Sequence, residues 1–562
     1  MLQSPPPSAL PPPLFPPENM AICERCSRPL DRVQRDRSFK STTDEVLFVH
    51  SQVKRIDHEI HRLAAQRVLL QRRLNSIAPF TVLLPYEIIS NIFQLVCPPL
   101  NITTTTDSPA NDTVPPNHHG GLSYPTMPFT LAAVCSQWRD IALSTPQLWT
   151  SAALTLYQGR NLSNAHALDA LFTRSAPCPL SLSLIFASAD DARERLLADV
   201  PPSSDVLRVF LAHSHRWRSL KIDGLPPEWI PALRQATHAT PNLHQLWLCP
   251  YDNSREQQMI DMFSHAPQLR RVTLDNTFLS AITLPWSGLT HLKVSWVSID
   301  ECAEMLRRCP CLVECDFSRI LSNAEFHPLP PRSNSNTLPI ILPSLRSLSW
   351  SYAGDAWEFQ LFERILFPNL NVFKLKLRYD LMQFSMIVSV LRGMLGETSK
   401  EVEKLELDLG CPWVDVYEVL KEVRRVRVLR VVDEQDEQMV KKVVEALVVK
   451  TPTTTSEECF LPRLRVLEWR GHCWVDLVMV KWVVDKLKMR WEMDSQCLLS
   501  SSERVRLEKV TLDLTCGGHL LGLMDGERLV SDEVRELERM GMELVIVHRR
   551  HCPSQEEGEG EA

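Results

Sequence analysis

The feature that most limits how this chain can fold is a short template that returns repeatedly after residue 149. The template reads Pro-x-Leu-x-x-Leu-x-Leu, and its last apolar positions alternate with other residues as they do in a half-buried β-strand. Copies that keep the proline begin at residues 241, 267, 310, 343, 368 and 462. Looser copies without the proline lie at 217–222, 289–294, 402–407, 426–431, 507–512 and 542–547. Each copy predicts one strand.

The segments between these strands have the apolar spacing of amphipathic helices. They lie at 254–265, 298–308, 356–366, 380–395, 414–425, 436–449 and 475–489. Ser298 and Glu301 also have the spacing of a capping box, which marks the beginning of a helix. Alternating strands and helices resemble an irregular leucine-rich repeat, in which stacked units share a core that no single unit can form. We therefore expect a solenoid with a parallel sheet and right-handed crossovers over residues 151–551, with strands at 152–156 and 179–186 capping its N-terminal end.

Upstream of the repeats, two short helices are predicted at 82–96 and 129–142. The first has two apolar stripes, Leu84, Ile88, Ile92 and Leu95 on one face and Ile89, Phe93 and Val96 on the next. The second helix has a single stripe of Leu131, Val134, Trp138 and Ile141. So small a helical unit has too little core to bury both stripes of its first helix. The pattern therefore favours a face that contacts another protein, although core helices of a larger α-helical domain would show the same spacing.

The same stretch resembles a known family. Its first half reads Leu83-Leu-Pro-Tyr-Glu-Ile-Ile-Ser-Asn-Ile-Phe93, and its second reads Leu131-Ala-Ala-Val-Cys-Ser-Gln-Trp-Arg-Asp-Ile-Ala-Leu-Ser-Thr-Pro-Gln-Leu-Trp149. In this order the two halves resemble the F-box of the fungal F-box protein families, and the repeats that follow are similar to the C-terminal halves of many F-box proteins. The chain departs from the family in a loop insertion at 98–128, which is longer than the usual loop.

The resemblance implies a three-helix module at 78–150 that docks on a Skp-type adaptor, and through it on cullin and RING subunits. The adaptor-binding residues that it implies are Leu84, Pro85, Ile88, Ile92, Phe93, Leu131, Val134 and Trp138. The expected fold class is thus α/β, with a small all-α F-box module followed by an irregular leucine-rich-repeat-like α/β solenoid.

The template also predicts where a protein target binds. Its leucines point into the core, so the residues that flank the last two point to the opposite, concave face of the sheet. The target-binding candidates there are Trp247, Arg271, Lys293, Asp316, Lys374, Lys376 and Glu406. We expect Trp247 to lie exposed beside Arg271, because Trp and Arg are enriched in binding hot spots. The alternative is that these residues are only the solvated side of a sheet.

A separate helix is predicted at 44–77, ahead of the F-box-like stretch. Its apolar residues alternate spacings of three and four, which is typical of a coiled coil, and Arg67 interrupts them. They are Val49, Val53, Ile56, Ile60, Leu63, Leu70, Leu74 and Ile77. Such a helix needs a partner, which is a second copy, the F-box-like helices or the C-terminal unit; the pattern does not choose among them.

Composition and charge exclude several classes of function. The 61 basic and 68 acidic residues leave a formal net charge of −7, so no global field attracts nucleic acid or an anionic membrane. The 16 cysteines follow no framework spacing, and no signal peptide is recognisable, so we expect reduced thiols and a cytoplasmic or nuclear location. No apolar run reaches the length that a bilayer span requires.

No catalytic motif is recognisable, so the chain is not expected to be an enzyme or to need a cofactor. Cys23 and Cys26 have the spacing of half a zinc site, but no second pair follows, and two free cysteines are the better interpretation. The proline-rich residues 1–43 and the acidic tail at 552–562 are expected to be disordered. Polar segments at 322–338 and 451–458 are expected to be mobile loops.

Two functions are compatible with this organisation. In the first, the chain is the substrate-recognition subunit of an SCF-type cullin-RING ubiquitin ligase, and the solenoid holds an unknown protein target. In the second, the chain is a non-catalytic interaction scaffold that does not act in ubiquitination. Copurification of cullin and RING subunits, and faster turnover of a bound partner, would distinguish them.

Overall fold

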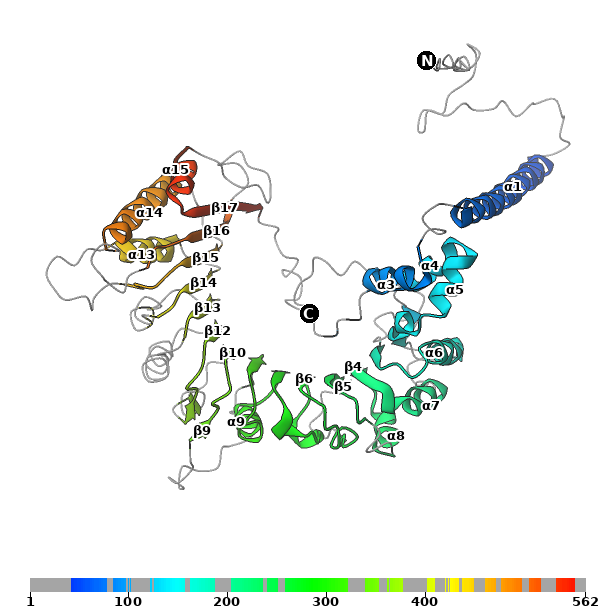
Figure 1. Ribbon diagram of the computed structural model, residues 1–562, viewed down its shortest axis with the longest axis horizontal. Coiled ribbons are helices and arrows are strands. Elements are labelled where there is room, and N and C mark those ends of the chain that lie inside the picture. Colours follow the sequence, from blue (N-terminus) through cyan, green and yellow to red (C-terminus); the bar gives the residue numbers. More distant parts are fainter. Residues whose placement is uncertain are drawn as a thin grey trace, which may run out of the picture. The chain divides into compact units, whose positions relative to one another are not determined.

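The computed structural model describes the chain in segments that together form two compact units (Figure 1). The first unit comprises residues up to Leu84 together with Ala133–Arg139, and the second comprises Pro85–Ala132 and Asp140 onward. The described residues are 42–77, 84–97, 100, 102, 122–123, 126–156, 162–186, 204–235, 240–250, 258–321, 339–352, 361–362, 364–377, 402–409, 420, 423, 425–433, 437–448, 460–471, 477–497, 505–516 and 532–550.

The first unit contains the long helix α1 (Thr42–Ile77), in the region where the heptad pattern predicts a helix. It also contains a break between two short helices, α4 (Thr126–Val134) and α5 (Ser136–Leu143). The sequence predicted one helix over 129–142, and this prediction is wrong at Cys135. The backbone N–H of Trp138 donates to Cys135 Sγ at 3.4 Å, and that of Arg139 donates to Cys135 O at 3.0 Å. Cys135 therefore caps a new helix instead of continuing the old one.

The second unit is built on one long sheet. Within the described residues the sheet has fifteen strands in the order β1-β2-β3-β4-β5-β6-β7-β8-β10-β12-β13-β14-β15-β16-β17, and all pairs except β1 with β2 are parallel. The predicted parallel sheet is thus present, and it begins at the predicted N-terminal strands. The strand bounds are β1 Leu122–Ser123, β2 Ser151–Leu156, β3 Leu180–Phe186, β4 Trp217–Leu225, β5 Gln245–Pro250, β6 Arg271–Asp275, β7 His291–Ser295, β8 Glu314–Ser318, β10 Ser347–Tyr352, β12 Val372–Leu377, β13 Lys404–Leu409, β14 Val428–Asp433, β15 Val466–Gly471, β16 Lys509–Cys516 and β17 Glu543–Arg550.

The proline of the template forms a turn that leads into each strand. In all six copies, the N–H of the first template leucine donates to the carbonyl of the residue before the proline. The donors are Leu243, Leu269, Leu312, Leu345, Leu370 and Leu464, at N···O distances from 3.0 to 3.4 Å. This is the hydrogen bond of a four-residue turn, and proline suits its second position because the ring fixes φ near the required value. The template therefore encodes a turn and a strand together.

The last two template positions form two buried rows across the sheet. Leu246 and Leu248 of β5, for example, lie level with Val272 and Leu274 of β6, and all four side chains are buried. Both rows belong to one core cluster that continues from β2 to β17. Each strand buries little alone, so the core depends on the neighbouring repeats, as expected of a solenoid.

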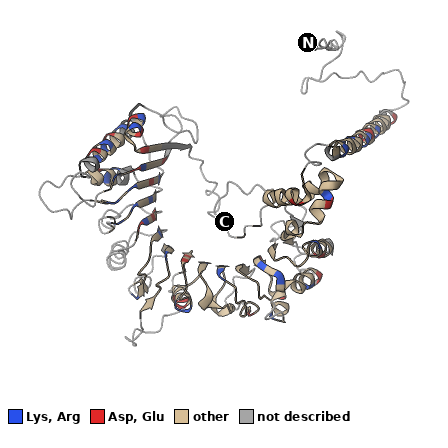
Figure 2. Cartoon of the chain, viewed as in Figure 1, with Lys and Arg blue, Asp and Glu red and all other residues tan. Residues whose placement is uncertain are grey.

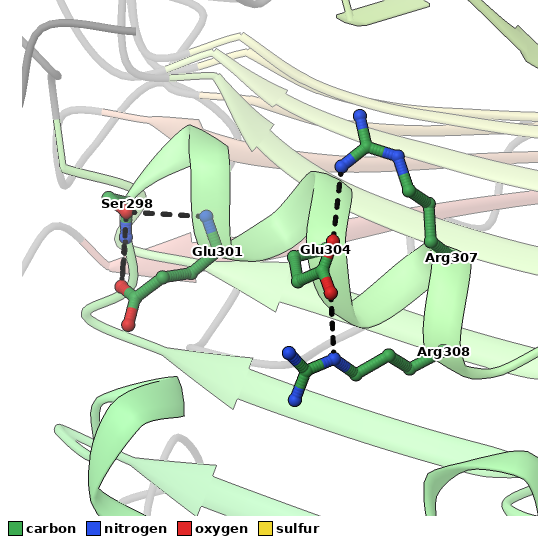
Figure 3. Close-up of polar contacts among 5 residues, drawn as sticks. All are labelled: Ser298, Glu301, Glu304, Arg307 and Arg308. Atoms are coloured by element: carbon green, nitrogen blue, oxygen red, sulfur yellow. Dashed lines mark hydrogen bonds and ion pairs between the residues drawn. The ribbon is translucent and has the colours of Figure 1, made fainter. Parts of the chain in front are cut away.

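Helices run along one face of the sheet (Figure 1). Their bounds are α6 Leu162–Arg174, α7 Ser204–Ala212, α8 Ile230–Gln235, α9 Ile299–Arg308, α13 Glu437–Val448, α14 Leu477–Cys497 and α15 Asp532–Met540. The predicted capping box at the beginning of α9 is confirmed (Figure 3): the Glu301 N–H donates to Ser298 Oγ at 3.4 Å, and the Ser298 N–H donates to Glu301 Oε2 at 3.2 Å. One turn further, Glu304 binds Arg307 and Arg308 at 3.2 and 2.8 Å, which supports the same short helix.

Two buried arginines tie consecutive repeats together. Arg216, which precedes β4, donates to Ser175 Oγ at 2.6 Å and to the carbonyl oxygens of Cys178 and Phe172. Arg490 of α14 donates to the carbonyl oxygens of Leu447, Phe460 and Leu461 at 2.9, 3.3 and 3.2 Å. A guanidinium has several fixed donors, so one buried side chain can bind carbonyl oxygens from two or more neighbouring segments at once.

Several sequence predictions differ from the structure or lie outside it. The predicted helix at 254–265 is wrong over its described part, because Ile260 forms a parallel bridge with Ile282 instead. The end of the predicted helix at 356–366 is also wrong, since β11 (Ile365–Leu366) pairs with β9 (Ile340–Ile341). Predictions for 1–41, including Cys23 and Cys26, for 103–121, 322–338, 380–395, 451–458 and 552–562 lie outside the described residues.

Candidate functional site

Helix α3 (Tyr86–Val96) is held in the second unit by one of its two apolar stripes. Ile89 and Phe93 of that stripe are buried, and between them Ser90 Oγ lies 3.0 Å from Thr145 Oγ1. At the N-terminal end, Tyr86 Oη lies 2.6 Å from Ser144 Oγ. The stripe therefore fixes how α3 is rotated about its own axis.

The segment after α5 continues this attachment toward the sheet. Trp149, in the short 3-10 helix η1 (Pro146–Trp149), is buried, and its indole N–H donates to Ala142 O at 2.8 Å. The ring of Phe129 packs edge-on against Trp149 with centroids 5.1 Å apart. Arg174, at the end of α6, places its guanidinium 5.0 Å from the centroid of the same indole. Because η1 leads directly into β2, α3 and η1 form a continuous packed structure with β2 and α6.

The other stripe of α3 is not covered by the described part of the chain. Ile88 is 45% exposed and Leu95 is 83% exposed, and Ile92 between them is half-buried. Further exposed apolar side chains come from the same region of the second unit, namely Tyr86, Val96, Met127, Phe129 and Leu143. Exposed apolar residues concentrated in this way are typical of a surface that contacts another protein.

The predicted adaptor-binding residues divide into three groups. Pro85 and Ile88 are exposed in the second unit, and Ile92 is half-buried there. Phe93 and Leu131 are buried, so they hold the helices and do not offer their side chains to a partner. Leu84, Val134 and Trp138 are half-buried and belong to the first unit. The prediction omitted Leu95, although it lies on the same stripe as Ile88, seven residues further on.

The second candidate surface is the face of the sheet opposite the buried rows, here called the open face. Its middle row follows one register from strand to strand. The row reads Ser183, Lys221, Trp247, Thr273, Lys293, Asp316, Ser349, Lys374, Glu406, Arg430, Glu468, Thr511 and Val545. Five of the seven predicted target-binding residues lie in this row, whereas Arg271 lies one row before it and Lys376 one row after it.

Charged residues on the open face pair with oppositely charged neighbours. Lys293 lies 3.6 Å from Asp316, Lys374 lies 3.3 Å from Glu406, and Arg430 lies 3.8 Å from Glu468. Figure 2 shows that basic and acidic residues gather on the C-terminal strands. Burial alone would raise the pKa of Glu406, but hydrogen bonds and ion pairs with Lys404 and Lys374 outweigh it and lower the pKa. The face is thus locally neutralised, which suits recognition of a polar protein surface better than attraction of a polyanion.

Trp247 is placed differently from the prediction. It lies on the open face but is only 9% exposed, and Lys221 Nζ sits 4.3 Å from the centroid of its ring. The register places Thr273 level with Trp247, and Arg271 level with Gln245. Arg271 itself is exposed. The tryptophan and the arginine are therefore not direct cross-strand neighbours, and the arginine is the more accessible of the two.

Polar groups on the N-terminal part of the open face are shifted toward their neutral forms. Burial raises the pKa of Asp223, although Lys221 at 3.6 Å partly offsets this effect. Burial, followed by the nearby Asp275 and Asp223 carboxylates, raises the pKa of Cys249 to about 12. Burial and the charge of Arg271 lower the pKa of His291, so its contact with Glu314 at 3.9 Å is not a full ion pair at neutral pH. Burial therefore disfavours the charged forms of all three side chains on this part of the face.

The part of the chain that the structure describes offers neither a metal centre nor a membrane-spanning helix. It contains no cluster of three or more His, Cys, Asp or Glu side chains that could hold a metal ion. None of its helices combines the length and the apolar character that crossing a bilayer requires.

Comparisons with known proteins add little to these observations. No protein-family model matches the sequence, and no curated protein matches it. A crystal structure of a Bacteroides fragilis protein is 13% identical and covers 66% of this chain and 75% of its own, with a TM-score of 0.23. The APL1 leucine-rich repeat domain is 11% identical and covers 71% of this chain and 97% of its own, with a TM-score of 0.21. At these TM-scores the fold description rests on the chain's own repeats.

Proposed function

We propose that this chain is the substrate-recognition subunit of an SCF-type cullin-RING ubiquitin ligase. The observation that carries the proposal is the outward stripe of α3, where Ile88 and Leu95 are exposed while Ile89 and Phe93 anchor the same helix. A helix with one stripe packed and one stripe free is suited to dock in the apolar groove of a partner. The resemblance of residues 83–93 and 131–149 to an F-box supports a Skp-type adaptor as that partner.

The open face supports the second half of this proposal, which is capture of a protein target. Its middle row presents side chains at regular intervals along a single sheet, and cross-strand ion pairs hold the charged ones in defined orientations. Such a surface favours selectivity over raw affinity, since the paired charges are already partly neutralised. In this proposal the chain does no bond chemistry and needs no cofactor, and it works in the cytoplasm or nucleus.

A non-catalytic scaffold is the alternative function. It would use the same exposed α3 stripe and open face to hold proteins together, without delivering them to a ubiquitin ligase. The long helix α1 supports this alternative, because its exposed apolar residues offer a further contact surface.

Affinity purification of the full chain, with and without a proteasome inhibitor, distinguishes the two functions. A substrate receptor should copurify cullin and RING subunits under both conditions, and inhibition should raise the amount of at least one other partner. A scaffold should copurify the same partners in the same amounts under both conditions. Absence of cullin and RING subunits from both purifications would contradict the receptor function.

Target binding should depend on Arg271. We expect Arg271→Glu to weaken target binding by about tenfold, because it reverses an exposed charge on the open face. Arg208→Glu is the matched control, since Arg208 is an equally charged, exposed residue on the outer helix α7. The measurement is the dissociation constant of each variant for a partner recovered under proteasome inhibition. Equal binding by both variants would place the target elsewhere than on this part of the open face.

A further inference from the structure

Helix α1 carries a heptad pattern over five successive a and d pairs, in which Arg67 is the one polar residue. The a positions are Val46, Val53, Ile60, Arg67 and Leu74, and the d positions are Val49, Ile56, Leu63, Leu70 and Ile77. The helix has 36 residues and is therefore about 54 Å long. A pattern sustained over this length specifies a continuous seam of side chains for a second helix.

The described part of the chain leaves this seam open to solvent. Its apolar a and d side chains are between 46% and 72% exposed. In isolation a helix gains no tertiary packing, so its apolar stripe is stabilised only when a partner covers it.

The charge of α1 is divided unevenly along its length. Residues 44–60 carry four acidic and two basic side chains, whereas residues 61–77 carry four arginines and no acidic residue. The net charges of the two halves are therefore −2 and +4, with histidine neutral. Figure 2 shows basic residues and acidic residues along the helix. A second copy in the parallel direction would place +4 against +4, but an antiparallel copy places +4 against −2 at both ends.

The polar residue in the seam favours the same direction. In a parallel, in-register pair, the two Arg67 side chains would face each other across the seam. In an antiparallel pair with residues 46 and 77 level, Arg67 of each copy lies level with Ile56 and next to Asp57 of the other. Each guanidinium then meets a carboxylate at the edge of the seam, where both remain hydrated.

The apolar residues are compatible with this direction. A bias toward β-branched residues at a and leucine at d favours parallel dimers. Here the a positions include Val46, Val53 and Ile60, and the d positions equally include Val49, Ile56 and Ile77. The side chains at the a positions are therefore similar in shape to those at the d positions. An antiparallel pair places each a position level with a d position, and similar shapes suit such layers. The packing therefore does not oppose the direction that the charges favour.

We propose that α1 binds α1 of a second copy of this chain in an antiparallel two-stranded coiled coil. The proposal rests on α1 alone and does not depend on the proposed function. A second copy is favoured over the F-box-like helices and the repeats, because two α1 helices that run in opposite directions are complementary in charge.

Sedimentation of the full chain tests whether the seam forms a dimer. We expect a dimer for the natural chain and a monomer for Ile60→Asp with Leu63→Asp, because these changes bury carboxylates at adjacent a and d positions. Both side chains are exposed in α1, so we expect the changes to leave the sheet and its core intact. Far-ultraviolet circular dichroism of the full chain checks that its secondary structure is retained. A monomeric natural chain, or a dimer that survives both changes, would overturn the proposal.

Charge exchange tests the direction. Asp57→Lys alone and Arg67→Glu alone should each raise the dimer dissociation constant by about tenfold, or roughly 1.4 kcal/mol, because each creates two like-charge contacts in the antiparallel pair. The double variant Asp57→Lys with Arg67→Glu should recover most of this loss. In a parallel pair residues 57 and 67 are far apart, so exchange would bring no recovery. A double variant no tighter than the weaker single variant would overturn the antiparallel assignment.

Discussion

Replacing Ile88 and Leu95 together by aspartate should weaken binding to a Skp-type adaptor by at least about 100-fold. Both side chains lie on the outward stripe of α3, and docking would bury them in a desolvated groove. The change removes two apolar contacts and adds two carboxylates that the groove would have to desolvate, a loss of roughly 3 kcal/mol or more. Isothermal titration of the full chain with the purified adaptor gives the dissociation constant.

The control for this prediction is Ile341→Asp. Ile341 lies in β9 and is 53% exposed, so it is comparable to Ile88 in chemistry and accessibility but lies in a repeat. The control should bind the adaptor like the natural chain. All three positions are exposed, so thermal unfolding should change little in either variant. Adaptor binding that survives the paired change on α3 would remove the main support for the proposed function.

Replacing Arg490 by alanine should lower the free energy of unfolding by about 3–5 kcal/mol. The guanidinium is buried and donates to the carbonyl oxygens of Leu447, Phe460 and Leu461, which come from α13 and from the turn before β15. Its removal takes a buried donor away from three carbonyl oxygens, of which that of Leu461 keeps a hydrogen bond from the Leu464 N–H, and it opens a cavity between α13 and α14. Denaturant unfolding of the full chain measures the loss.

Two further variants show whether the arrangement of donors matters. Arg490→Lys keeps the charge but not the planar fork, so it should recover less than half of the loss. Arg465→Ala removes an exposed arginine that pairs with Glu508 at 3.5 Å, and it should change stability by less than about 0.5 kcal/mol. If Arg490→Ala cost no more than this control, the carbonyl contacts would not stabilise the repeats.

The strands could be predicted from the sequence because turn and strand are specified by neighbouring residues. The proline fixes the turn before the strand, and alternation places each leucine on the buried face. Helices α6 and α7 were not predicted, although the sequence of each has the apolar spacing of an amphipathic helix. Leu168, Leu171 and Phe172 in α6, and Val206 and Phe210 in α7, have helical spacing and are buried.

Features that depend on distant residues could not be predicted in this way. The apolar spacing of 254–265 fits a helix, but backbone hydrogen bonds link Ile260 to Ala281 and Thr283 instead. The template placed Trp247 on the correct face, but it could not show that Lys221 of the neighbouring strand lies over the ring or that Trp247 is only 9% exposed. Arginine is usually a surface residue, so nothing local indicated that Arg490 is buried.

The order of the strands in the sheet allows the protein to fold while it is being synthesised. Every long strand pairs with the strands before and after it in sequence, and the six proline turns close within four residues. The contacts that complete one repeat are therefore available as soon as the next has left the ribosome. We expect α3 and the first strands to fold during synthesis, so that the exposed apolar stripe of α3 forms while the C-terminal repeats are still being translated.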